Sequence, residues 1–97
     1  MSVHKFRLEL SESAKLDLRD ILSFTLQTWG EGQLVEYKHK IDNALNTLIE
    51  NPQVGRPKHG MKVYPVGRHL IFYRLAESTV FVVRILHERM DTERHLT

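Results

Sequence analysis

Three apolar runs with strand-like composition lie close together in the second half of the chain. They cover Met61–Val66, His69–Ala76 and Thr79–Leu86, and only two residues separate each run from the next. The separators, Gly67-Arg68 and Glu77-Ser78, are typical of tight turns. Such close spacing implies hairpins, so the sequence predicts an antiparallel meander against which the earlier elements must pack.

Two helices are predicted before the meander. Ser11 suits the N-cap of the first helix, because its hydroxyl can accept a hydrogen bond from an unpaired backbone N–H, and Gly30 ends that helix. The second helix runs from about Gly32 to Glu50. It stops at Asn51-Pro52, because a proline ring disfavours helical geometry at the residue before it. The short break at Gly30 predicts a helical hairpin.

Apolar residues recur at three- and four-residue spacing in both helices. The first stripe ends at Trp29, which we expect to be a core residue that joins the helices to the sheet. Leu16 lies nearly opposite this stripe and is either simply exposed or a contact for a partner. The two stripes are Ala14, Leu18, Ile21, Leu22, Thr25 and Trp29, and Leu34, Tyr37, Ile41, Ala44, Leu45 and Leu48.

The order of the predicted elements is β-α-α-β-β-β. Alternating apolar residues at Lys5–Leu10 predict the first strand, and Asn51–Gly60 reads as a turn-rich loop. Because both helices belong to one crossover, we expect an α+β fold of two layers. The helical hairpin would pack on one face of a mainly antiparallel sheet, in a single domain spanning residues 1–97. The tail His87–Thr97 is polar, with one helical turn expected near Asp91–Leu96.

The last two predicted strands are apolar on both faces. We assign Ile71, Tyr73 and Leu75, with Phe81, Val83 and Ile85, to the core. A two-layer domain leaves the other face open, and that face would carry Leu70, Phe72, Val80 and Val82 with Arg74 and Arg84 at its rim. An exposed apolar patch with a charged rim usually marks a partner site. The alternative is that the tail or the central loop covers it.

The charge balance is mildly basic, with a net charge of +2 from 14 basic and 12 acidic residues. This bias suits a nucleic acid or an acidic protein as partner. The chain has no cysteine, no secretory signal and no apolar run of the ~20 residues that span a bilayer, so we expect a cytoplasmic protein without membrane contact. The basic residues of the C-terminal half are Arg56, Lys58, Lys62, Arg68, Arg74, Arg84, Arg89 and Arg94.

No metal or cofactor site is expected. None of the six histidines forms a close pair at ligand spacing on one helix face, and Asp91 stands where a zincin motif beginning at His87 would need its second histidine. Metal-free RNA cleavage needs a base, an acid and cations. The candidates are His69, Tyr73, Arg84, His87 and Arg89. Because they form no dedicated acid–base pair, we favour a binder without catalytic residues.

Several short motifs, taken in order, resemble the ParE/RelE toxin superfamily over nearly the whole chain. The match at the last two strands is more similar to ParE than to RelE. The motifs are Ala14-Lys15-Leu16-Asp17-Leu18-Arg19-Asp20-Ile21, Trp29-Gly30, Tyr37, Asn51-Pro52, Gly55-Arg56-Pro57, His69-Leu70-Ile71-Phe72-Tyr73-Arg74 and Arg84-Ile85-Leu86-His87-Glu88-Arg89-Met90-Asp91.

The resemblance implies a toxin of a type II toxin–antitoxin pair, a class tied to plasmid stabilisation and growth inhibition. ParE-type toxins are associated with inhibiting DNA gyrase and so blocking replication, whereas RelE-type relatives cut messenger RNA on the ribosome. We expect a gyrase inhibitor that forms a hetero-oligomer with a ParD-like antitoxin. The alternatives are a ribosome-dependent endoribonuclease and an inert member of the family that still binds its antitoxin.

Each expectation has its own residues. The target-binding set lies at or beyond the end of the last strand, where the core constrains side chains less, and consists of Arg84, His87, Arg89, Met90 and Arg94. The antitoxin-binding set is Leu70, Phe72, Arg74, Val80, Val82 and Leu16. For the nuclease alternative, the catalytic set would be His87, Arg84, Arg89 and Tyr73.

Overall fold

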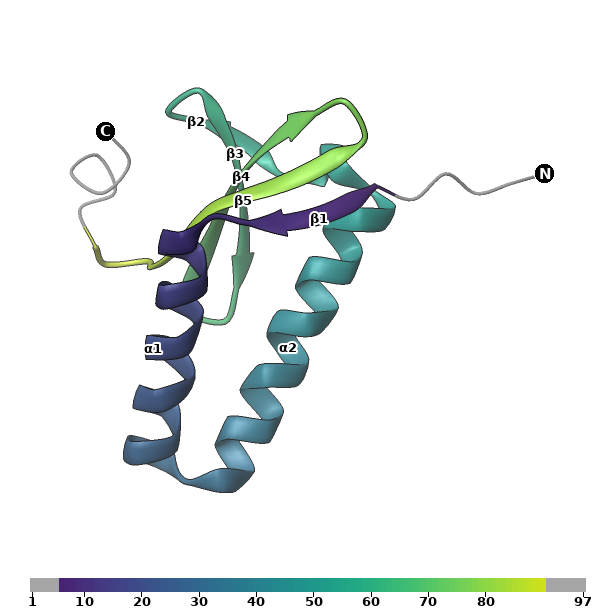
Figure 1. The fold of residues 1–97 in the computed structure, drawn as a ribbon. Helices are drawn as coiled ribbons and strands as arrows, with labels where there is room; N and C mark the ends of the chain where they lie inside the picture. The colour runs from purple at the N-terminus through teal and green to yellow at the C-terminus, as the bar shows by residue number, and fades with distance from the viewer. Residues whose placement is uncertain (1–5, 91–97) are drawn as a thin grey trace.

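The computed structural model describes residues 6–90, which form two helices on one face of a five-stranded sheet (Figure 1). The strands lie in the order β1-β5-β4-β3-β2; β1 is parallel to β5 and the other neighbours are antiparallel. This confirms the predicted two-layer α+β fold. The elements are β1 Arg7–Leu10, α1 Glu12–Trp29, α2 Glu31–Glu50, a 3-10 turn Pro52–Val54, β2 Arg56–Lys58, β3 Met61–Val66, β4 His69–Ala76 and β5 Thr79–His87.

Ser11 begins α1 as its sequence context predicts. The Ser11 hydroxyl oxygen accepts a hydrogen bond from the Ala14 backbone N–H at 2.9 Å, and the same hydroxyl donates to the Val83 carbonyl at 2.6 Å. One side chain therefore caps the helix and ties its first turn to β5. At the other end, Gly30 has φ +91° and turns the chain directly into α2.

The core lies between the helices and the sheet. Ala14 of α1 and Ile41 of α2 are buried there against Ile71, Tyr73 and Val80 of the sheet. A second, smaller cluster occupies the opposite face of the sheet and contains no helix residue; it consists of Met61, Val63, Phe72 and Leu86, with Leu70 and Val83 partly buried beside it. Both faces of the sheet therefore carry buried apolar side chains.

A bulge in β5 changes which residues face the helices. Tyr73 pairs with Val82 and Phe72 pairs with Arg84, so Val83 has no partner in β4. This extra residue shifts the alternation. The prediction that Val80 and Val82 lie on an open face is therefore wrong, because both are buried against the helices. Phe72 does lie on the opposite face, but it is completely buried there rather than exposed.

The expected loop Asn51–Gly60 contains one further strand, β2, which pairs with β3. The hairpin turn between them has positive φ at His59 (53°) and Gly60 (75°), the pattern of a type I′ turn. At its far end, β5 continues through His87, one residue beyond the predicted strand. The helical turn expected near Asp91–Leu96 lies outside the described residues.

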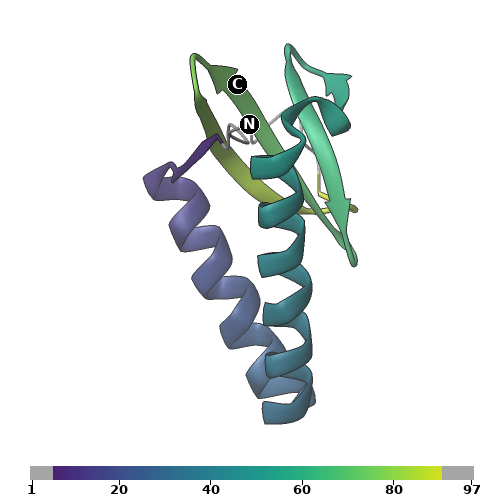
Figure 2. The same ribbon diagram turned by 90° about the vertical axis from the view of Figure 1, so that its right-hand side faces the viewer.

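The helical hairpin extends beyond the end of the sheet (Figures 1 and 2). The predicted core role of Trp29 is therefore wrong: the side chain lies at the free end of the hairpin and is 67% exposed. Leu16, on the outer side of α1, is exposed too. Neither α1 nor α2 has a long enough apolar stretch to cross a membrane, and the described residues contain no other helix of that length.

Candidate functional site

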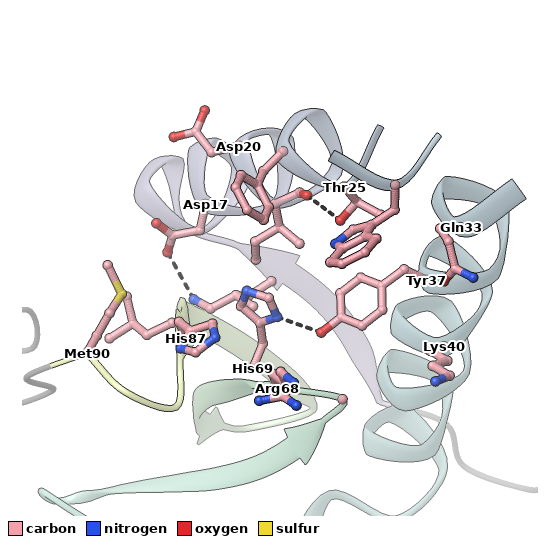
Figure 3. Close-up of a pocket in the computed structure, with 16 residues that line it drawn as sticks. Asp17, Asp20, Thr25, Gln33, Tyr37, Lys40, Arg68, His69, His87 and Met90 are labelled. Carbon is pink, nitrogen blue, oxygen red and sulfur yellow. Dashed lines mark hydrogen bonds between the residues drawn. The ribbon is translucent and has the colours of Figure 1, made fainter. Parts of the chain in front are cut away.

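A groove of about 750 Å³ lies between the two helices and the adjoining end of the sheet (Figure 3). It forms because α1 and α2 splay apart from their joined tip toward the sheet (Figure 1). Its walls combine apolar, acidic and basic side chains. They include Asp17, Asp20, Ile21, Phe24, Thr25 and Trp29 from α1, Gln33, Tyr37 and Lys40 from α2, and Arg68, His69, Ile85, His87 and Met90 from the sheet and its turns.

Tyr37 and His69 form the polar centre of this groove. The Tyr37 hydroxyl donates to the Val66 carbonyl at 3.0 Å and lies 2.5 Å from Nδ1 of His69. The hydroxyl has one proton, so which of the two groups donates in the contact with His69 depends on the tautomer of the histidine ring. Burial raises the pKa of Tyr37, although its hydrogen bond to the backbone at Arg68 opposes the shift.

His87 stacks edge-on against His69, with the ring centroids 5.3 Å apart. Burial lowers the pKa of His69, the neighbouring His87 lowers it further, and Glu88 acts in the opposite direction. Nδ1 of His87 accepts the Arg89 backbone N–H at 3.1 Å, so a neutral His87 carries its proton on Nε2. The two rings therefore contact each other at the end of the sheet, and His87 holds the turn that leads to Met90.

Gly67 allows the β3–β4 turn to approach Tyr37 this closely. Its φ is +57°, in the left-handed region, and a Cβ atom placed there would lie 2.6 Å from Cε1 of the Tyr37 ring. Any larger residue would be strained and would also displace the tyrosine. A glycine in this turn is therefore part of how the groove keeps its shape.

Arg84 is engaged in the fold and does not project toward a target. Its guanidinium donates to both carboxylate oxygens of Asp17, at 2.7 and 2.8 Å, and the Ile85 backbone N–H donates to the same carboxylate at 2.9 Å. The Asp17 hydrogen bond raises the pKa of Arg84. The expectation that Arg84 is free at the strand end or at the rim of an open patch is therefore wrong.

Tyr73 is also structural. It is fully buried, donates its hydroxyl proton to the Pro52 carbonyl at 2.8 Å and accepts the Gly55 backbone N–H at 2.9 Å. Burial raises the pKa of Tyr73, which keeps the phenol protonated near neutral pH. The residue fastens the central loop to the sheet, so it cannot serve as a catalytic acid or base in this arrangement.

The remaining predicted residues fall into three groups. His87 and Met90 line the groove, and Arg89 is exposed beside them. Arg74 and Leu70 lie on the opposite side of the sheet, with Arg74 exposed. Arg94 lies outside the described residues. Among residues 6–90 no group of three or more His, Asp or Glu side chains is placed to hold a metal ion.

The sequence does not predict that an exposed aromatic pair and two cations give the groove its character. Phe24 is 64% exposed and, like the exposed Trp29, lines the groove, while Lys40 and Arg68 supply positive charge. The one available signal was Phe24, a large aromatic residue that stands outside the apolar stripe of its helix. An exposed apolar surface of this kind, bordered by charged side chains, is typical of a site that binds another macromolecule.

Comparison with known proteins gives a consistent match. The family model described as "ParE toxin of type II toxin-antitoxin system, parDE" matches residues 8–92. The chain is 36% identical over 95 residues to Toxin ParE1 of Mycobacterium tuberculosis, covering 93% of this chain and 97% of that protein. It is 33% identical to Toxin ParE1 of Caulobacter vibrioides, covering 90% and 94%.

Two solved structures share the fold. A chain of the chromosomal ParDE system from P. aeruginosa superposes with a TM-score of 0.75 at 19% identity, covering 87% of this chain and 97% of that one. A chain of the M. tuberculosis RelBE2 complex superposes with a TM-score of 0.64 at 19% identity, covering 89% and 94%.

Proposed function

This chain belongs to the ParE toxin family of type II toxin–antitoxin systems, and we propose that it blocks replication by binding DNA gyrase and that a ParD-like antitoxin neutralises it. Its resemblance to ParE-type rather than RelE-type toxins supports gyrase as the target. Because gyrase works on DNA in the bacterial cytoplasm, the proposal places the chain there.

The observation that carries the proposal is the loss of half of the nuclease set to structural roles. Arg84 is paired with Asp17, and Tyr73 is buried between Pro52 and Gly55. Phosphodiester cleavage without a metal depends on cations and an acid–base pair at one phosphate. Of that set only His87 and Arg89 remain accessible, which favours binding over chemistry.

The turn after β5 is the surface we propose for the gyrase contact. Arg89 and Met90 are both exposed there, and Met90 also lines the groove. An arginine guanidinium can hold a carboxylate or a phosphate through charge-assisted hydrogen bonds, and a methionine adapts to irregular apolar surfaces. Contact at this turn needs no proton transfer.

The groove is the surface we propose for the antitoxin. Phe24 and Trp29 offer apolar anchors, and Lys40 and Arg68 can pair with acidic residues of an incoming segment. Antitoxin segments that fold on binding would gain most of their affinity from such anchors. This location replaces the open sheet face expected from the sequence, because Val80 and Val82 are buried against the helices and Phe72 is buried on the opposite face.

Gyrase supercoiling assays with the purified chain test the main proposal. The wild-type chain should inhibit supercoiling, and Arg89→Glu should lose about tenfold or more in potency because it reverses the charge of the contact. Arg19→Glu makes the same charge change at an exposed position of α1 and should keep full potency. A wild-type chain that leaves gyrase unaffected would overturn the assignment.

A ribosome-dependent messenger RNA endoribonuclease is the second candidate, and one observation favours it. Tyr37, His69 and His87 are in contact in the groove, with Arg68 beside them. Histidine acid–base catalysis typically contributes about 10²–10⁴-fold in rate. A nuclease should therefore lose messenger RNA cleavage by about that factor in His87→Gln, whereas a gyrase inhibitor should retain its potency in the same variant.

A further inference from the structure

We propose that the face of the sheet opposite the helices binds a single strand of nucleic acid, holding its phosphates with Arg56, Lys58 and Arg74 and one of its bases on Phe81. The strand register places these side chains together. Arg56 pairs with Val63 and Lys58 pairs with Met61, both members of the apolar cluster on that face. Directly paired residues share a face of a sheet, so the two cations stand on the side away from the helices.

Arg74 and Phe81 join them from the other half of the sheet. Arg74 lies two residues after Phe72, another member of that cluster, and is paired with Phe81. The flanking residues Val80 and Val82 point the other way, into the helical core. Arg56 and Lys58 are then about 7 Å apart along β2, and two strand spacings, about 10 Å, separate β2 from β4.

These three cations are available for a ligand. All are exposed, and none of their side chains has an ion-pair or hydrogen-bond partner within the described part of the chain. Cations on the helices differ in this respect, because they have acidic partners. Lys15 contacts Glu12 and Lys38 contacts Asp42, each at 3.4 Å. Glu9 of β1 is the acidic residue that pairs with Phe81. Its carboxylate oxygen lies 4.0 Å from a guanidinium nitrogen of Arg7.

The chemistry of this face selects the class of ligand. Its large apolar residues, Met61, Val63, Phe72 and Leu86, are already buried, so a protein partner would find few apolar anchors. What the face offers is unpaired positive charge around a half-buried aromatic ring. Cations that follow a backbone, with an aromatic ring for a base, are how proteins hold single strands. A duplex keeps its bases stacked and would leave Phe81 unused.

Fluorescence anisotropy with a labelled 12-nucleotide oligothymidylate, measured with the full chain between about 50 and 200 mM salt, tests the proposal. Three phosphate contacts predict a slope of log K against log salt of about −2, or about a 20-fold loss of affinity over this range. Arg56→Gln, Lys58→Gln and Arg74→Gln together should bring the slope close to zero. A matched variant with Lys15→Gln, Arg19→Gln and Lys38→Gln removes the same charge from the helices and should bind like wild type.

The base contact has its own variants. Phe81→Leu keeps an apolar side chain but removes the ring, and should weaken binding about 5- to 150-fold with the salt slope unchanged. Phe81→Tyr should retain binding. Circular dichroism and thermal melting confirm that each variant is folded. Equal losses in the two triple variants, an unaffected Phe81→Leu, or equal affinity for a 12-base-pair duplex would overturn the proposal. The binding assay contains neither gyrase nor antitoxin, so its outcome does not depend on whether the proposed function is correct.

Discussion

Trp29 illustrates how a residue can follow an apolar stripe and still be exposed. It continues the spacing of Ala14, Leu18 and Ile21, which do face the core, but α1 passes the end of the sheet before reaching it. A helical pattern records which side of the helix a residue occupies. It does not indicate how far the sheet extends along the helix. Trp29 lies beyond the end of the sheet and therefore at the rim of the groove.

Trp29→Ala should therefore separate stability from binding. We expect the thermal midpoint to stay within a few degrees of wild type, because little buried surface is lost. Affinity for the antitoxin should fall about 30-fold or more, the loss typical of an aromatic hot-spot residue worth about 2 kcal/mol or more. Thermal denaturation and isothermal titration calorimetry measure the two quantities.

Val35→Ala is the control for this variant, because Val35 is exposed on α2 but does not line the groove. It should bind the antitoxin normally. If both variants bind normally, the antitoxin occupies another surface. A large loss of stability in Trp29→Ala would instead show that the end of the hairpin is packed.

Among the elements, β5 is the one whose internal geometry could not be predicted. The sequence signals for helix ends are local: Ser11, Gly30 and Asn51-Pro52 each act on the backbone beside them, and the helices do begin and end there. The bulge at Val83 has no such signal, because it depends on how β5 pairs with β4. Strand β2 was missed because three residues with a central proline are too short for a period-two pattern.

The candidate site was predictable only in part for the same reason. His87 ends the last strand and Met90 follows it, and their position at the groove could be predicted from that strand alone. The partnership of Asp17 with Arg84 joins α1 to β5 across 67 residues of sequence. The Tyr37–His69 contact spans 32 residues. Such contacts depend on the packing angle of the helices, which no local pattern specifies.

Asp17→Asn should destabilise the docking of α1 on β5. The carboxylate and the guanidinium are 13% and 22% exposed, and the carboxylate also accepts the Ile85 N–H. Removing the carboxylate charge that pairs with Arg84 should lower the free energy of unfolding by about 2–4 kcal/mol, a large share for a small domain. Urea denaturation measures this difference.

The exposed neighbour Asp20 offers a matched control on the same helix. Asp20→Asn breaks only a 4.0 Å contact with Arg19 and should change the free energy of unfolding by less than about 0.5 kcal/mol. Equal effects of the two substitutions would mean that the Asp17–Arg84 pair contributes nothing beyond a surface charge.

At the scale of the whole molecule, the helices and the sheet create two separate surfaces. The groove lies between the helices at one end of the sheet, and the cationic residues Arg56, Lys58 and Arg74 lie on the face that the helices leave free. An antitoxin in the groove would therefore leave the proposed nucleic-acid face accessible, so the two ligands could be held at the same time.

The stability of the whole domain should depend on pH through His69. Its pKa is lowered in the folded chain, so the unfolded chain, with a histidine pKa near 6.5, takes up a proton first as the pH falls. The stabilising contribution is complete above pH ~6.5 and is lost as the pH falls through the lower folded pKa. The thermal midpoint should fall in this window, and His69→Gln should reduce the slope.

His39→Gln, at an exposed position of α2, is the control and should leave the slope unchanged.

At alkaline pH the dependence of stability on pH has the opposite sign. The pKa values of Tyr37 and Tyr73 are raised by burial, so their contribution is complete below pH ~10 and is lost above it. A midpoint with the same acid dependence in wild type and His69→Gln would show that other groups control it.

The overhang of the helical hairpin also bears on how the free chain behaves at high concentration. Phe24, Leu26, Trp29 and Val35 are exposed at or near its tip, and a net charge of +2 supplies little repulsion between copies. Colloidal stability is therefore weakest at that end of the molecule. A partner that covers the tip would therefore also prevent self-association of the chain, as a chaperone does when it covers an exposed apolar surface.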